Sequence, residues 1–112
     1  MWAVRELTVA DVVGNAPMAL AREYFQLMRK KWPKLNAKLV TSHGVASDKV
    51  YFVTEQKSLA DNEQWDKAFW ADDDVKKLVE RQNQLAKENG GRHVFTPWRD
   101  LFFYDASEEE LK

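Results

Sequence analysis

The stretch from Trp65 to Leu78 constrains the fold of this chain more than any other part of the sequence. Trp65 and Phe69 lie on the apolar stripe of a short helix, which three consecutive aspartates then interrupt. From Val75 onward, apolar residues recur at helical spacing as far as Asn89-Gly90-Gly91, a typical helix stop. The sequence therefore predicts two successive amphipathic helices, the second capped by one of the aspartates.

Four other segments have the composition of β-strands. Their Val, Thr, Leu and aromatic residues alternate between two phases, as the side chains of a strand do. Pro97 lies in the last of these segments and indicates an edge strand or a bulge, because proline cannot donate a ladder hydrogen bond. The predicted strands cover residues 2–9, 36–45, 50–57 and 92–104.

A further helix is predicted between the first two strands. Asn15 is a suitable N-cap, Pro17 is tolerated in a first helical turn, and Pro33 ends the helix. Later in the chain, Asp61 and Gln64 resemble a capping box at the start of the tryptophan-rich helix. The predicted apolar stripe of the first helix comprises Met18, Ala21, Phe25, Met28 and Trp32.

The order of these elements predicts an α+β fold. Strand, helix, strand, strand, helix, strand gives a ferredoxin-like βαββαβ arrangement, with a four-stranded antiparallel sheet and two helices on one face. Apolar residues occur in both phases of the strands, so we expect a second copy of the chain to bury the other face and form a homodimer. Residues 1–106 are expected to form a single domain and residues 107–112 a frayed tail.

Composition excludes several classes of function. The 112 residues include 17 basic and 18 acidic side chains, for a net charge of −1, so the chain offers no strong positive field for nucleic acid. There is no cysteine, no zinc-type spacing and no run of apolar residues long enough to span a membrane. We therefore expect a cytoplasmic protein that binds no nucleic acid, inserts in no membrane and holds no metal.

Over residues 2–104 the chain resembles the dimeric α/β-barrel superfamily. The resemblance is carried by the split helix, in which Trp65 to Trp70 is followed by Ala71-Asp72-Asp73-Asp74-Val75. It implies that two sheets from two subunits close into a barrel, and that each subunit holds a small-molecule pocket between its sheet and its helices. Fold alone does not determine activity.

Within that superfamily the chain resembles the antibiotic-biosynthesis-monooxygenase-like members. This implies a cofactor-independent monooxygenase, in which a deprotonated phenolic or polyketide-like substrate reacts with oxygen while the pocket supplies orientation and desolvation. His43 and Tyr51 are the candidate proton-transfer groups, and Arg5 or Arg99 is the candidate for stabilising a phenolate.

The predicted substrate-binding residues are Arg5, Trp65, Trp70 and Gln82. The two tryptophans would form flat walls with one N–H donor each, and Gln82 is a polar position on an otherwise apolar helical face. Each candidate also has a structural explanation, since Trp65 lies on the core stripe and Tyr51 fits dimer packing. His43, between Ser42 and Gly44, fits an ordinary residue at the end of a strand.

Heme degradation, another activity of the superfamily, is disfavoured by the sequence. Those enzymes carry an iron-ligating histidine about ten residues after the pocket tryptophan. The corresponding positions here are Val79 and Glu80, and neither is a plausible heme ligand. No cofactor is therefore expected.

Two alternative functions remain open. One is a polyketide cyclase or isomerase, with His43 or Tyr51 as acid or base. The other is a non-catalytic ligand-binding or structural dimer, which gains support if Trp65 and Trp70 fill the pocket themselves.

Overall fold

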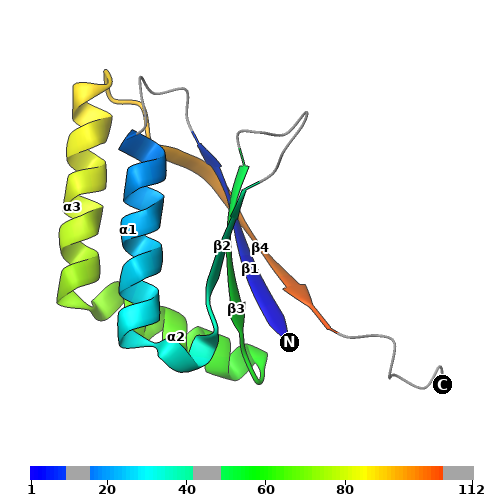
Figure 1. The fold of residues 1–112 in the computed structure, drawn as a ribbon. Helices are drawn as coiled ribbons and strands as arrows, with labels where there is room; N and C mark the ends of the chain where they lie inside the picture. Colours follow the sequence, from blue (N-terminus) through cyan, green and yellow to red (C-terminus); the bar gives the residue numbers. More distant parts are fainter. Residues whose placement is uncertain (10–15, 42–48, 105–112) are drawn as a thin grey trace.

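The structure, a computed structural model, describes residues 1–9, 16–41 and 49–104, and of residues 96–98 only the backbone. The described residues form an α+β fold with one four-stranded antiparallel sheet and three α-helices. All three helices lie on the same side of the sheet, with α1 and α3 side by side and α2 across one end of them (Figure 1). The elements are β1 (Trp2–Val9), α1 (Ala16–Lys31), the 3₁₀ helix η1 (Pro33–Leu35), β2 (Lys38–Thr41), β3 (Lys49–Glu55), α2 (Leu59–Ala71), α3 (Asp73–Glu88) and β4 (Phe95–Phe103).

The strands lie in the order β2-β3-β1-β4. All neighbouring strands are antiparallel, and β1 pairs along almost its whole length with both β3 and β4. β4 is therefore an edge strand, which confirms the prediction made from Pro97. Its pairing with β1 shifts register between Leu7 and Val9, as at a β-bulge.

Three of the predicted strands are shorter in the structure, and β3 covers Lys49–Glu55 instead of residues 50–57. β2 begins at Lys38 rather than at residue 36, because Asn36 adopts a left-handed conformation with φ of 47° and its backbone N–H closes the turn of η1 on Pro33. Residues 42–45 of the predicted strand, which include His43, lie outside the described residues. β4 begins at Phe95 rather than at residue 92, because Gly90 and Gly91 both have positive φ in the turn that follows α3.

Helix α1 ends before Pro33, as predicted. Four residues of its predicted stripe lie in the core or pack against it, namely Met18, Ala21, Met28 and Trp32, whereas Phe25 does not. Phe25 is half-buried and packs beneath the Arg29 guanidinium, whose central carbon lies 5.7 Å from the ring centroid. Leu20 and Tyr24, which are outside the predicted stripe, are buried next to Ala21 and Met28. Asn15, the predicted cap, lies outside the described residues.

Helix α2 begins earlier than predicted. The Ser58 hydroxyl accepts a hydrogen bond from the backbone N–H of Asp61 at 3.2 Å, so Ser58 is the N-cap. Asp61 is thus a residue of the first turn rather than the cap. At the other end of α2, Asp72 is both the C-cap of α2 and the N-cap of α3, which confirms that one of the three aspartates caps the second helix.

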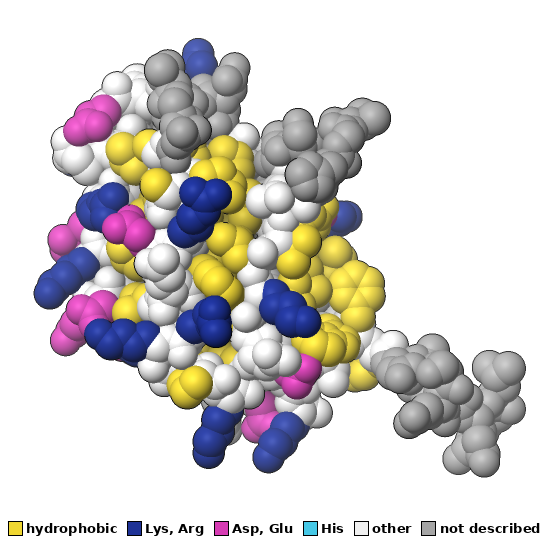
Figure 2. Space-filling model, viewed as in Figure 1, with side chains coloured by type: hydrophobic (Ala, Val, Ile, Leu, Met, Phe, Trp, Pro, Cys, Tyr) yellow, Lys and Arg dark blue, Asp and Glu magenta, His cyan; other side chains and the backbone are white. Residues whose placement is uncertain are grey.

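The hydrophobic core lies between the sheet and the helices. It draws side chains from β1, β3 and β4 on one side and from all three α-helices on the other, and its centre is fully buried at Leu20, Val50, Val75 and Val94. On the surface in the same view, charged side chains spread over the helices and hydrophobic side chains emerge on the side of the sheet (Figure 2). The predicted tail, residues 107–112, lies outside the described residues.

Candidate functional site

A cavity of about 230 Å³ lies between the helix-covered face of the sheet and the helices. All three α-helices and strands β1, β3 and β4 contribute to it. Its surface is mostly apolar, which is typical of small-molecule pockets. The apolar walls include Leu7, Met28, Phe52, Phe69, Val79 and Phe95.

Helix α2 supplies an aromatic wall. Trp65 and Phe69 are four residues apart and therefore share one face of the helix. Their ring centroids lie 5.4 Å apart, and the Trp70 ring meets Phe69 edge-on at 5.0 Å. Trp32, just beyond α1, meets Trp65 edge-on at 6.1 Å. These ring-to-ring contacts hold the aromatic wall in one arrangement.

The first polar group at the cavity is centred on Arg5. Its guanidinium donates to both carboxylate oxygens of Asp100, at 2.8 and 3.0 Å, and lies 3.2 Å from the Asp66 carboxylate. Burial alone would lower the pKa of Arg5, but the two carboxylates outweigh it and raise that pKa. Asp66 also accepts a hydrogen bond from the Trp70 indole N–H at 3.2 Å, so four side chains form one network.

The second polar group joins α1 to α3. The Tyr24 hydroxyl donates to the side-chain oxygen of Gln82 at 3.0 Å, and both residues line the cavity. Burial raises the pKa of Tyr24 to about 12, because the phenolate would lose its hydration there. Tyr24 is therefore a neutral donor across the physiological pH range.

One donor at the aromatic wall has no partner. The indole nitrogen of Trp65 is buried and makes no hydrogen bond among the described residues. A buried donor without an acceptor costs about 1–3 kcal/mol.

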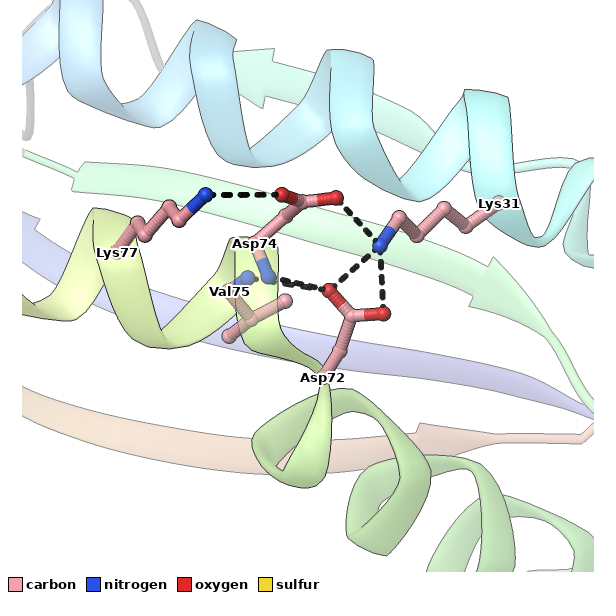
Figure 3. Close-up of polar contacts among 5 residues, drawn as sticks. All are labelled: Lys31, Asp72, Asp74, Val75 and Lys77. Carbon is pink, nitrogen blue, oxygen red and sulfur yellow. Dashed lines mark hydrogen bonds and ion pairs between the residues drawn. The ribbon is translucent and has the colours of Figure 1, made fainter.

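The acidic break joins the start of α3 to the end of α1 (Figure 3). Asp72 accepts hydrogen bonds from the backbone N–H groups of Asp74 and Val75, at 2.9 and 3.2 Å. The Lys31 ammonium lies between the two aspartates, 2.7 Å from an oxygen of each. Asp72 therefore caps α3, as the sequence predicted for one of the three aspartates, and Asp72 and Asp74 both pair with Lys31.

The Lys31 contacts predict a measurable acid dependence of stability. Lys31 lowers the pKa of Asp72 and of Asp74 below the ordinary value of 3.8. The stabilisation of the fold by the Lys31 contacts is thus fully present above the unfolded-state pKa of the aspartates. It is lost as pH falls through their lower folded-state pKa. We expect the difference between urea midpoints at about pH 6 and about pH 3 to shrink in Lys31→Met.

Lys77→Met provides the matched control for this prediction. The Lys77 side chain is 77% exposed and lies 4.0 Å from Asp74, so its removal should leave the pH dependence close to that of the wild type. If the difference between the two urea midpoints shrank equally in both variants, net charge rather than the Lys31 contacts would set the acid dependence of stability.

The structure brings four of the six predicted site residues to the cavity: Arg5, Trp65, Trp70 and Gln82 all line it. Tyr51 lies on the opposite face of the sheet, in the row formed with Val40 and Glu6, and is not among the lining residues. Successive side chains of a strand point to opposite faces of the sheet, and Phe52, the residue after Tyr51 in β3, lies on the cavity side. His43, the other proposed proton-transfer residue, lies outside the described residues.

Arg99, the alternative to Arg5, also lies away from the cavity. It pairs with Glu6 at 3.2 Å on the uncovered face of the sheet. Arg5 and Arg99 belong to opposite phases of their strands, and only Arg5 is in the phase that faces the helices.

Sequence reasoning missed Tyr24, Asp66 and Asp100 as site residues. Tyr24 has a detectable signal, since it shares helical spacing with Leu20 and Met28. Asp66 precedes Trp70 by one helical turn, which is also visible in the sequence. Asp100 has no local signal, because its place opposite Arg5 depends on the register of β4 against β1.

Two further observations concern other kinds of site. Among residues 1–9, 16–41 and 49–104, no three His, Asp or Glu side chains are arranged to hold a metal ion. None of the helices in this part of the chain combines the length and the apolar character that crossing a membrane requires.

Comparison with known proteins identifies no relative. No family model matches the chain, and neither the curated proteins nor the solved structures include a match. The function of the site therefore has to be inferred from its own geometry.

Proposed function

We propose that this protein binds a small, flat, largely apolar molecule of the phenolic or polyketide-like class in the cavity between its sheet and its helices. The observation that carries the proposal is that the cavity is open although aromatic side chains line it. Trp65 and Trp70 form its wall and leave about 230 Å³ unfilled. The Tyr24–Gln82 pair, which lines the cavity, provides the few polar groups that orient a ligand in such a pocket.

The proposed scaffold is a ferredoxin-like dimeric α/β barrel. The strand order supports the topology, because each helical crossover skips one strand: β3 lies between β1 and β2, and β1 lies between β3 and β4. The uncovered sheet face supports the dimer. We call the apolar residues of that face the open sheet face: Trp2, Val4, Val40, Tyr51, Val53, Leu101 and Phe103.

The open sheet face is more apolar than a solvated sheet surface usually is. Val53 and Val4 are direct cross-strand neighbours at its centre, and Leu101 continues the same row. Trp2, Val40 and Phe103 are 37%, 44% and 51% exposed. Burial of this face against the same face of a second copy would remove these side chains from water with two-fold symmetry.

Oxygenation of the ligand, the activity that the resemblance implies, remains a prediction with its own test. Of the two proposed proton-transfer residues, Tyr51 lies on the open sheet face and His43 lies outside the described residues. If a phenolic compound binds, oxygen consumption with that compound would support the monooxygenase. Turnover without oxygen uptake would support the cyclase or isomerase, and binding without turnover would support the binding protein.

The binding proposal is tested by quenching of tryptophan fluorescence with a panel of phenolic, quinone and polyketide-like compounds and hemin. We expect saturable quenching by at least one phenolic or polyketide-like compound. Trp70→Phe should weaken that binding by about three- to tenfold, because it removes indole surface from the aromatic wall and the hydrogen bond to Asp66.

Trp2→Phe is the control for the quenching experiment. It makes the same substitution on the open sheet face, where the Trp2 ring lies 5.8 Å from the Lys38 ammonium. Its affinity for the ligand should match that of the wild type. Absence of quenching by every compound would refute the proposed pocket, and equal weakening in both variants would place the binding elsewhere.

A further inference from the structure

The charged side chains at the cavity do not form a binding site for an anion. Arg5 is the one basic residue among the described residues that line the cavity. Two carboxylates already share its guanidinium, Asp100 through two hydrogen bonds and Asp66 at 3.2 Å. These three side chains together carry one net negative charge. The positive charge of Arg5, which was predicted to stabilise a phenolate, is therefore already neutralised by the protein's own carboxylates.

The rest of the cavity gives an anion little compensation. Its walls are mainly aromatic and aliphatic, so an anionic ligand would lose hydration on entry. It would also be repelled by the Asp100 carboxylate, which lines the cavity, while Asp66 adds a second negative charge next to Arg5. The protein's own phenol in the cavity follows the same rule, because burial raises the pKa of Tyr24 to about 12 and keeps it protonated.

We propose that the cavity selects aromatic ligands in their uncharged form and discriminates against the matching carboxylate or phenolate. The proposal rests on the proposed function and specifies the ligand class of the same site. An uncharged ligand with a hydrogen-bonding group can meet the Tyr24–Gln82 pair without adding a negative charge near the two carboxylates. A phenol bound here keeps its proton, and this disfavours the deprotonation that oxygenation requires.

The test compares two ligands of similar size and opposite charge state by isothermal titration calorimetry near neutral pH. The probes are 2-naphthol, which is uncharged, and 2-naphthoate, which is an anion. We expect the full-length wild-type protein to bind 2-naphthol at least about tenfold more tightly. Comparable affinity for the two probes, or tighter binding of 2-naphthoate, would overturn the proposal.

A charge-removing variant assigns the discrimination to this site. Asp100→Asn removes one of the two carboxylates that share Arg5, so the ratio of the two dissociation constants should fall about tenfold. Glu6→Gln makes the same change of charge at the Arg99 pair on the other face of the sheet, and there the ratio should stay within about twofold. An unchanged ratio in Asp100→Asn, or equal changes in both variants, would overturn the assignment.

The experiments distinguish a failure of this inference from a failure of the proposed function. If neither probe binds the wild-type protein and no compound of the panel quenches tryptophan fluorescence, the pocket proposal is refuted and this inference with it. If the probes bind without preference, the pocket stands and the charge selectivity is refuted. The wild-type comparison needs no variant, so it decides the selectivity even if Asp100→Asn lowers stability.

Discussion

Replacement of Phe69 by alanine should lower the free energy of unfolding by about 3–5 kcal/mol. Phe69 is 6% exposed, and its ring contacts those of Tyr24, Trp32, Trp65 and Trp70, with centroids 5.0 to 6.2 Å apart. Alanine would leave a void beside an existing cavity and remove the ring against which the other aromatic side chains pack. Since domains of this size are stable by about 5–15 kcal/mol, the loss is a large fraction of the total.

Urea and thermal denaturation followed by circular dichroism measure this loss, and we expect the Tm to fall by at least about 10 °C. Phe25→Ala is the matched control, because Phe25 lies under Arg29 and outside the core cluster. Its effect should stay within about 1 kcal/mol. Equal losses in the two variants would contradict the central position of Phe69 in the core.

Replacement of Val53 by glutamate should convert the proposed dimer to a monomer. Val53 lies between Val4 and Lys38 in the central row of the open sheet face. In the monomer the new carboxylate can pair with Lys38 across the strands, so the fold should persist. In the dimer it would be buried, and we expect the dimer dissociation constant to rise by about 100-fold or more.

The measurement is molar mass by light scattering over a dilution series, with circular dichroism as a check on folding. The wild-type protein should have twice the mass of the chain. Leu59→Glu is the control, because it puts the same charge on a 47% exposed apolar residue at the start of α2, away from the open sheet face. A monomeric wild-type protein would refute the dimer, and a dimeric Val53→Glu variant would place the interface on another surface.

Local sequence signals predicted several boundaries correctly. Residues 2–9 form β1 as expected, Pro33 ends α1, and the acidic break caps α3 through Asp72. Each of these depends on interactions within a few residues along the chain, namely side-chain alternation, the missing proline N–H and a carboxylate that accepts from nearby backbone N–H groups.

Predictions that depended on longer-range contacts were less accurate. The sequence predicts Phe25 in the buried stripe of α1, whereas in the structure Tyr24 is buried there beside Ala21 and Met28, the correctly predicted residues. Both faces contain apolar residues, so helical periodicity alone does not separate them. Tyr51 and Phe52 present the same difficulty, since both are aromatic and only their register against β1 and β2 tells which one faces the helices.

The sequence by itself determined an α+β chain with a split amphipathic helix, an apolar sheet on both faces and no strong net charge. The tertiary structure alone decided the character of the site, because it placed Asp66 and Asp100 on Arg5, which is 95 residues from Asp100 in the chain. The physical reason is that local propensities act over one or two turns, whereas the charge of a cavity is the sum over side chains that only strand register and helix packing bring together. The sequence suggested that Arg5 binds an anion. In the folded chain Arg5 belongs instead to a network with one net negative charge.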